Sequence, residues 1–91
     1  MADKVHCAHI LVKTEQEAKQ ILDRLNRGES FSKIAMEKSL CPSGKKGGDL
    51  GTFGRGQMVR EFEVTAFKLD KGQTSGIIKT QFGYHVIKRL E

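Results

Sequence analysis

Long hydrophobic runs are missing from this 91-residue sequence, and none approaches the roughly 20 apolar residues that a membrane-spanning helix needs. We therefore expect no membrane span. Cysteine is also scarce. Cys7 and Cys41 are too few for a disulfide-stapled scaffold and fit a chain that works in its reduced state. The sequence has no internal repeat, linker or low-complexity tail, so we expect one small domain over residues 1–91.

The N-terminal residues, MADKVHC, contain no hydrophobic segment of the kind that signal peptides carry. We therefore expect the protein to stay in the cytoplasm, where its cysteines would remain reduced. We also expect it to act as a monomer.

The net charge of +5 raises the question of a nucleic-acid partner. The sixteen basic residues are scattered, and most lie near acidic ones. The one local excess is Lys45 and Lys46, followed by Arg55 and Arg60, and no aromatic residues alternate with it to stack on bases. The charge pattern therefore disfavours nucleic acid and suggests a mild preference for acidic partners.

Hydrophobic periodicity predicts both helices and strands. Residues 5–12 are a short, apolar, β-branched run typical of a central strand, with Cys7, His9 and Leu11 on one side. Thr14 and Glu17 form a capping box ahead of an apolar helical stripe that ends near Gly28. Further segments are a helix from Ser30 that ends before Pro42, a short strand near Leu50, a helix or strand over 59–67 with the helix preferred, and a hairpin of strands 74–80 and 83–90. This order predicts an α+β fold, with helices packed on a small antiparallel sheet.

The stretch from Cys41 to Phe62 holds six of the ten glycines, all between Gly44 and Gly56. Glycine allows positive φ angles and close approach of the backbone to other groups. Bulky apolar residues are interspersed with these glycines, so the stretch is either the wall of a pocket or a glycine-rich surface loop with a few anchoring side chains.

Two histidines lie inside predicted core strands, His9 near the N-terminus and His85 near the C-terminus. Each could be a hydrogen-bonded core residue, or the two could meet across neighbouring strands and fix each other's tautomers. Cys41 leaves three readings open: a thiolate–imidazole nucleophile with one histidine, a zinc ligand together with Cys7 and the histidines, or a polar pocket wall.

Three segments together resemble the parvulin family of peptidyl-prolyl cis/trans isomerases, also called PpiC-like rotamases. They are CAHILVK at 7–13, SLCPSGKKGGDLGTFGRGQMVREF at 39–62 and TQFGYHVIK at 80–88. The combination of GGDLG, GRGQM, an N-terminal HILV and a C-terminal FGYH is specific, and it covers essentially the whole chain. The resemblance implies a four-stranded antiparallel sheet wrapped by three to four helices, and a single-domain isomerase.

The resemblance also implies roles for individual residues. His9 and His85 match the family's paired core histidines, Cys41 matches a position held by cysteine or aspartate, and Thr80 matches a hydroxyl bonded into the histidine network. The proline ring would enter an apolar pocket made of Leu50, Met58 and Phe62, with Phe82 at its rim. We expect no metal and no cofactor, because rotation about an amide makes and breaks no bond.

Two departures from the family pattern concern substrates. Glu61 stands where many members have proline or a small residue, which bears only on substrate preference. The phosphate-directed branch carries an arginine-bearing loop after the first strand, but here Lys13 passes directly into the Thr14 cap. A lone lysine lacks the guanidinium fork that clamps phosphate.

The resemblance therefore implies phosphate-independent isomerisation of X–Pro bonds in peptides and unfolded chains, without a covalent intermediate, in support of protein folding. The alternative is a non-catalytic module that uses the same pocket to bind proline-containing or unfolded segments. Measuring peptide binding and cis/trans exchange together would separate the two.

Overall fold

The structure is a computed structural model that describes residues 4–91. The expected cytoplasmic location rests partly on residues 1–3, which lie outside the described residues. In chain order the elements are β1 (Lys4–Val12), α1 (Glu15–Asn26), α2 (Phe31–Lys38), the 3-10 helix η1 (Pro42–Lys46), β2 (Asp49–Gly54), α3 (Arg60–Lys68), β3 (Thr74–Thr80) and β4 (Gly83–Arg89).

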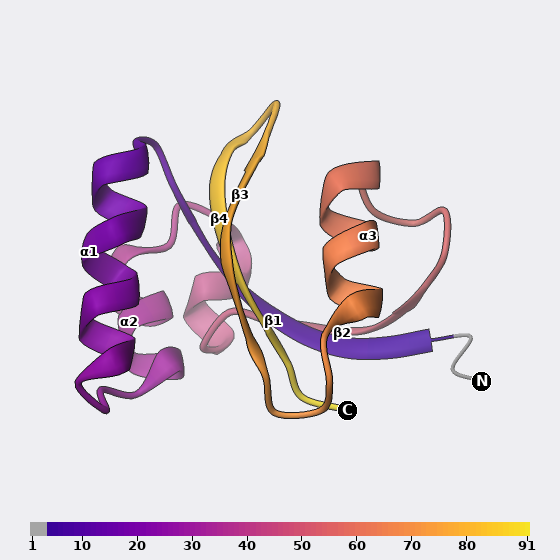
Figure 1. The fold of residues 1–91 in the computed structure, drawn as a ribbon, viewed down its shortest axis with the longest axis horizontal. Coiled ribbons are helices and arrows are strands. Elements are labelled where there is room, and N and C mark those ends of the chain that lie inside the picture. Colours follow the sequence, from indigo (N-terminus) through magenta and orange to yellow (C-terminus); the bar gives the residue numbers. More distant parts are fainter. Residues whose placement is uncertain (1–3) are drawn as a thin grey trace.

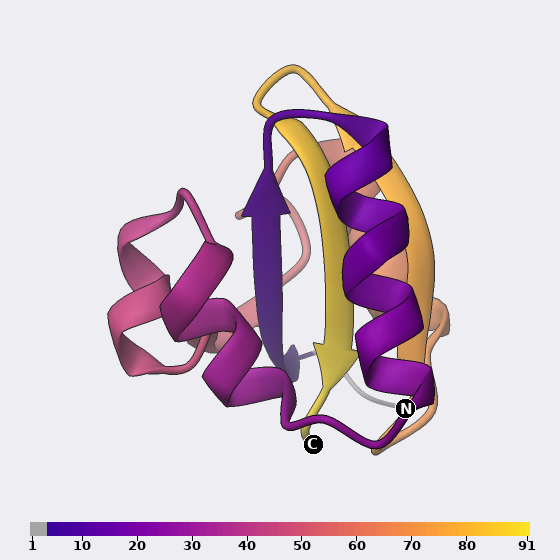
Figure 2. The ribbon, with the colours of Figure 1, turned by 90° about the vertical axis from the view of Figure 1, so that its left-hand side faces the viewer.

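The four strands form one antiparallel sheet in the order β2-β1-β4-β3, which places the first and last strands side by side at its centre. The helices α1 and α2 cover one face, and α3 covers the other (Figure 1). Seen from the first face, α1 runs along the sheet in front of β4 and β3 (Figure 2). The predicted α+β class, with a four-stranded antiparallel sheet and three to four helices, is confirmed.

The sheet separates two hydrophobic cores, because successive side chains of a strand point to opposite faces. Under α1 and α2, the buried residues are Ala8, Ile10, Val12, Ala18, Ile21, Phe31, Ile34, Ala35 and Val86. Under α3, they are Val5, Cys7, Phe53, Phe62, Ala66, Leu69 and Ile87. The alternation predicted for the first strand is therefore observed, with Cys7 and its same-side neighbours facing α3.

Capping side chains set the starts of the first two helices. The hydroxyl of Thr14 accepts the N–H of Glu17, and that of Ser30 accepts the N–H of Lys33. The carboxylate of Glu17 does reach back as predicted, but it accepts from the Thr14 hydroxyl at 3.0 Å. Segment 59–67 is helical as preferred, with bounds of Arg60–Lys68.

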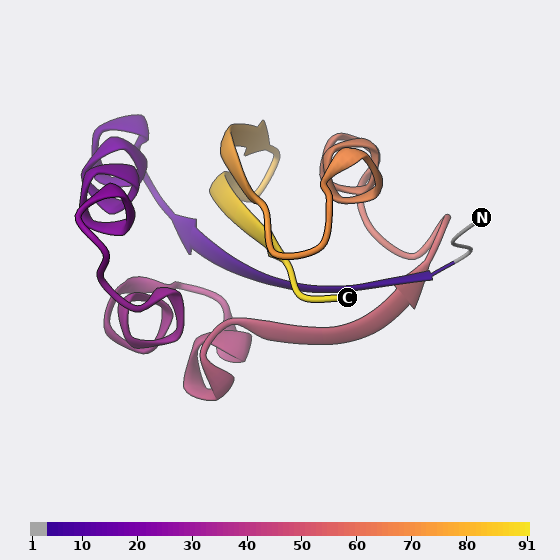
Figure 3. The same ribbon diagram turned by 60° about the horizontal axis from the view of Figure 1, so that its bottom comes forward.

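The glycine-rich stretch contains more regular structure than the sequence suggested. The helix from Ser30 ends before Pro42 as predicted, but Pro42 also begins η1, which packs beside α2, and β2 then runs alongside β1 (Figure 3). Gly48 explains one of the glycines. Its φ is +86°, its carbonyl accepts the His9 N–H at 2.9 Å, and a Cβ there would lie 2.4 Å from the His9 carbonyl oxygen.

None of the helices within residues 4–91 combines the length and the apolar character that crossing a bilayer requires.

Candidate active site

A pocket of about 370 Å³ opens on the α3 side of the sheet, and its size is typical of small-ligand sites. It is lined by His9, Leu11, Cys41, Leu50, Gln57, Met58, Val59, Phe62 and Phe82. The structure thus brings together six of the eight residues singled out from the sequence. The other two do not line the pocket: His85 is bonded to its His9, and Thr80 is bonded to His85.

The two histidines meet across the central strands. The strand register places Leu11 opposite His85 and His9 opposite Ile87, so the imidazoles lie diagonally on one face. Their Nδ1 atoms are 3.0 Å apart, and the rings stack with an interplanar angle of 19°. Both side chains are buried. The hypothesis that the histidines form a pair is therefore confirmed in its geometry.

Thr80 fixes where the protons of this pair lie. Its hydroxyl oxygen accepts the Phe82 N–H at 3.1 Å and lies 2.7 Å from His85 Nε2. If the hydroxyl donates to Nε2, the proton of a neutral His85 sits on Nδ1 and is donated to His9 Nδ1. The reverse order would leave two groups unpaired among residues 4–91, the threonine proton and the bare His9 Nε2, whereas this order leaves only the His9 Nε2 proton unpaired. Assigned from this network, His9 carries its own proton on Nε2.

Burial keeps the pair neutral. Removal from water, together with the neighbouring His85, lowers the pKa of His9 to about 4. Burial likewise lowers the pKa of His85 below its usual value. His9 Nε2 is buried and has no hydrogen-bond partner within residues 4–91. The pair therefore places an uncharged, oriented dipole beneath the pocket instead of a charged acid or a strong base.

Phe62 joins the apolar pocket to the histidine pair. Its ring meets His9 edge-on at 5.4 Å between centroids and 81° between planes, and it meets His85 at 5.5 Å and 80°. On its other side it contacts Phe53. One buried ring from α3 thus forms a pocket wall and holds both imidazoles in place.

Cys41 is half-buried at the edge of the pocket, and its position is fixed through the backbone. Ser39 Oγ accepts the N–H of Leu11 at 3.1 Å and that of Cys41 at 3.4 Å, while the Leu40 N–H donates to the Leu11 carbonyl at 2.7 Å. Within the described part of the chain, neither imidazole hydrogen-bonds to the Cys41 thiol. The polar-wall reading therefore fits better than the thiolate–imidazole nucleophile.

The zinc hypothesis is likewise not supported by a set of ligands among the described residues. Across residues 4–91, no group of three or more histidine, cysteine, aspartate or glutamate side chains is placed to hold a metal ion. His6, which received no role from the sequence, lies outside the pocket and pairs with Asp49 at 2.7 Å. A hydrogen bond from the Gly51 N–H, and then the one with His6, lower the pKa of Asp49.

Sequence reasoning missed four residues that shape this site. Leu11, Gln57 and Val59 line the pocket, and Ser39 anchors its Cys41 wall. Leu11 had a detectable signal, because the two-residue period of the strand puts it on the same side as His9. Gln57, Val59 and Ser39 had none, since their positions follow from how the loops fold back on the sheet.

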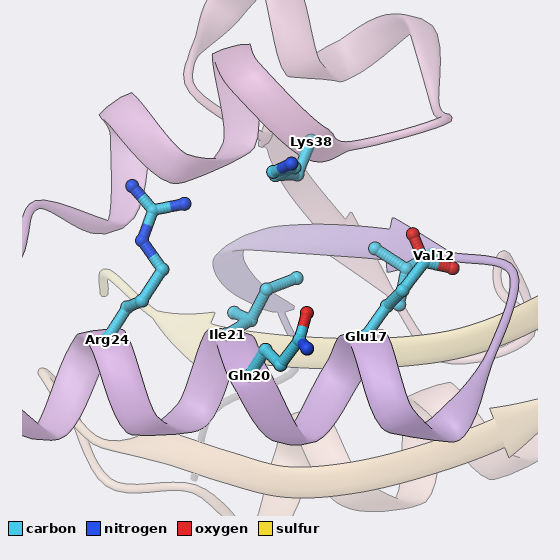
Figure 4. Close-up of a pocket in the computed structure, with 6 residues that line it drawn as sticks. All are labelled: Val12, Glu17, Gln20, Ile21, Arg24 and Lys38. Carbon is cyan, nitrogen blue, oxygen red and sulfur yellow. The ribbon is translucent and has the colours of Figure 1, made fainter.

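The small hollow between α1 and α2 is a poor candidate for a substrate site. Figure 4 shows Arg24 extending from α1 toward α2, with Gln20, Ile21 and Glu17 along the same helix. The space measures only about 50 Å³. Arg24 bonds both Glu29 and Glu37, so this region ties α1 to the following segment.

Comparison with known proteins agrees with the geometry. The family model described as "Rotamase: PPIC-type PPIASE domain" matches residues 9–91. The chain is 52% identical over 86 residues to the foldase protein PrsA of Geobacillus kaustophilus, covering 93% of this chain and 31% of that protein. It thus spans about a third of the length of the curated relatives it matches.

Two solved structures show the same fold. The peptidylprolyl isomerase PrsA from Bacillus cereus is 49% identical with a TM-score of 0.95, covering 98% of this chain and 35% of that one. The parvulin NmPin of Nitrosopumilus maritimus is 48% identical with a TM-score of 0.89, covering all of this chain and 99% of that one. The family model matches residues 9–91, the fold is shared with solved isomerases, and two paired histidines lie beside an apolar pocket. This chain therefore belongs to the rotamase family and is a PPIC-type peptidyl-prolyl isomerase domain.

Proposed function

We propose that this domain accelerates rotation about X–Pro bonds in unphosphorylated, unfolded chains, without a covalent intermediate. The observation that carries the proposal is an apolar pocket placed directly against a neutral, hydrogen-bonded histidine pair. The catalytic group of the proposal is His9, Cys41, Thr80 and His85, and the binding group is Leu50, Met58, Phe62 and Phe82.

The reaction requires no covalent step, because rotation about an amide makes and breaks no bond. Amide resonance sets a barrier of about 20 kcal/mol, which corresponds to rotation in tens to hundreds of seconds. An acceleration of about 10⁵-fold requires about 7 kcal/mol of differential stabilisation. The enzyme has to bind the twisted amide better than either planar form.

The two halves of the site suit that task. The apolar wall of Leu50, Met58 and Phe62 would hold the proline ring while the preceding carbonyl turns. Rotation breaks the conjugation of the amide and leaves the carbonyl free to reorient. The uncharged imidazole of His9 and the polar wall at Cys41 would favour that twisted form through their dipoles, without taking up a proton.

Two features support independence from phosphate. The pocket-lining residues among 4–91 include no lysine or arginine. The connection between the end of β1 at Val12 and the start of α1 at Glu15 is only two residues long, which leaves no room for an arginine-bearing loop. Bidentate phosphate recognition needs guanidinium groups that this side of the pocket does not supply.

Assistance to protein folding is the physiological role we propose. The curated relatives carry the name foldase, and this chain resembles about a third of each of them. Exposed Phe82, at 60%, gives the pocket rim an apolar surface that suits unfolded segments.

The deciding experiment measures binding and exchange on the same sample. A short Ala-Ala-Pro-Phe-type peptide is titrated while NMR follows both shift changes and cis/trans exchange, with Ala, Leu, Glu or phosphoserine before proline. We expect enhanced exchange for the unphosphorylated peptides. Binding without enhanced exchange would replace the enzyme by a binding module, and a strong phosphoserine preference would overturn the substrate class.

We further propose that the domain acts as a monomer in the cytoplasm. Cys7 is fully buried and Cys41 half-buried, and both are free thiols, as is usual in a reducing compartment. Sedimentation at micromolar concentration and cell fractionation test the two statements. A stable dimer or recovery outside the cytoplasm would contradict them.

A further inference from the structure

Three exposed large apolar side chains line the substrate pocket or a hollow next to it. Of the large hydrophobic residues of 4–91 that are exposed, Met36 is 61% accessible, Leu40 62%, Phe82 60% and Val64 39%. Phe82 lines the substrate pocket, whereas Met36 and Leu40 line a second hollow beside it. Exposed apolar groups that cluster next to a binding site indicate an interaction surface.

The second hollow, which we call the flanking groove, has a volume of about 330 Å³. It is lined by Met36, Ser39, Leu40, Cys41, Pro42, Gly44 and Lys45. Cys41 lines both hollows, so the flanking groove and the substrate pocket are neighbours with Cys41 as a shared wall. A chain bound in the pocket that crosses Cys41 would therefore reach the groove next.

The walls of the flanking groove are held in place before any ligand arrives. Its Ser39–Cys41 side is bonded to Leu11 of β1 through the Ser39 hydroxyl and the Leu40 N–H. Its opposite side is packed closely, because a Cβ added to Gly44 would lie 2.9 Å from the Ala35 carbonyl oxygen of α2. A preformed groove loses little free energy in ordering when it binds.

The charge at the groove has one sign. Lys45 is its one lining residue with a permanent charge, and it is exposed at the end of η1. An occupant that places a carboxylate beside its apolar group would match this arrangement of Met36, Leu40 and Lys45.

We propose that the flanking groove is a second substrate subsite, which takes an apolar side chain next to an acidic one in the unfolded client. This inference rests on the proposed isomerase function and deepens it by naming a sequence preference. Because the pocket and the groove share Cys41 as a wall, the apolar residue would lie close to the proline in the client sequence. The groove then selects clients, while the pocket turns their proline bond.

The test compares two peptide series on the intact protein. One is an alanine host around a single Ala-Pro bond, and the other places Leu-Glu at successive positions on either side of it. We expect one Leu-Glu position to lower KM about tenfold relative to the host, with kcat unchanged. Met36→Gln/Leu40→Gln should abolish that gain and leave activity on the alanine host intact. Lys45→Glu should shift the preference from Leu-Glu to Leu-Lys.

Val64→Gln is the matched control, because Val64 is exposed on α3 and lies outside both hollows. Equal turnover of both series by the wild type, or equal loss on both series in the double variant, would overturn the subsite. An inactive wild type on every peptide would instead overturn the isomerase function. Titration of the Leu-Glu peptide by NMR would then still show whether Met36 and Leu40 bind it.

Discussion

His9 and His85 face each other through the same ring atom, Nδ1, at 3.0 Å. Two protonated Nδ1 atoms cannot share that distance without repulsion, so the hydrogen bond exists only while one of the two nitrogens is bare. Because His85 must also accept from Thr80 on Nε2, its neutral form is the one that completes the network. The site is thus built around a pair that folding keeps uncharged.

The first prediction is a loss of stability in mild acid. The pKa of His9 falls from 6.5 to about 4 on folding, so between these values the unfolded chain binds more protons than the folded one. Stability is complete above pH 6.5 and decreases as the pH falls toward 4, by on the order of 3 kcal/mol. Urea unfolding at pH 7.5, 6.5, 5.5 and 5 measures the slope.

The pH range of that measurement has to exclude the titration of carboxylates. Hydrogen bonds from Arg24 lower the pKa values of Glu29 and Glu37 from 4.5, and Asp49 is lowered from 3.8, so all three act near and below pH 4.5. The interval from 6.5 to 5 therefore reports on histidine. A flat stability over that interval would contradict the neutral pair.

The second prediction concerns Thr80. Thr80→Val keeps the shape of the side chain but leaves His85 Nε2 and the Phe82 N–H without their partner. We expect a loss of about 1–3 kcal/mol in the free energy of unfolding, measured by urea denaturation. kcat/KM per folded molecule should fall less, because Thr80 lies outside the pocket.

Thr74→Val is the control on the same strand, because Thr74 is exposed there. It should change stability by less than about 0.5 kcal/mol. If Thr80→Val kept full stability but lost activity as a knockout of a catalytic base does, the histidine network would act by transferring a proton, and its role as a neutral, positioned dipole would be refuted.

The third prediction is that Cys41 forms no covalent intermediate. Cys41→Asp should retain substantial kcat/KM, because a polar wall tolerates an anion and no imidazole is bonded to the thiol. Peptide exchange kinetics and mass spectrometry of the wild type during turnover check this. Complete inactivity of the variant, alongside a thiol adduct in the wild type, would reverse the assignment.

The fourth prediction separates the pocket from the core under α3. Phe62→Ala removes a ring that contacts both histidines, so we expect a loss of about 3–5 kcal/mol in stability and a higher KM. Phe67→Ala is the matched control, since Phe67 lies on the same helix, against Phe53 and Arg55, outside the pocket. It should destabilise the fold but leave KM unchanged. Equal KM effects in the two variants would show that Phe62 does not bind substrate.

The fifth prediction tests the close approach at Gly48. Gly48→Ala adds both an unfavourable positive φ and a clash with the His9 carbonyl. Gly51→Ala shares the positive φ, at +75°, but its Cβ would meet nothing within 4 Å. We expect Gly51→Ala to cost about 1 kcal/mol and Gly48→Ala clearly more, with loss of activity. Thermal unfolding and kcat/KM compare them, and equal costs would mean that β1 simply moves aside.

The sheet and its helices could be predicted because their signals are local. The apolar, β-branched run around Ile10, the capping pair of Thr14 and Glu17, and the turn before Gly83 each indicate an element within a few residues. The helix η1 carried no such signal. Pro42 was used only to end the preceding helix, which does end before it, yet proline is equally suited to begin a new one.

The site could be predicted in composition but not in arrangement. Residue types and the family resemblance pointed to His9 and His85, but their contact depends on a strand register that only the folded sheet sets. The proton order through Thr80 depends on side-chain rotamers. Met36 and Leu40 carried no signal either, because an exposed leucine and a core leucine look the same in a sequence.

The central sheet keeps the two cores apart, and every residue assigned to catalysis and proline binding lies on or beside the α3 face. Substitutions on the helices of the other core, for example at Ala18 or Ile21 of α1, would therefore be expected to add to site substitutions independently, since the sheet lies between them and the histidine pair. Thermal stability could then be changed, by engineering or by evolution, through the core under α1 and α2. Substrate turnover could be changed separately on the α3 face.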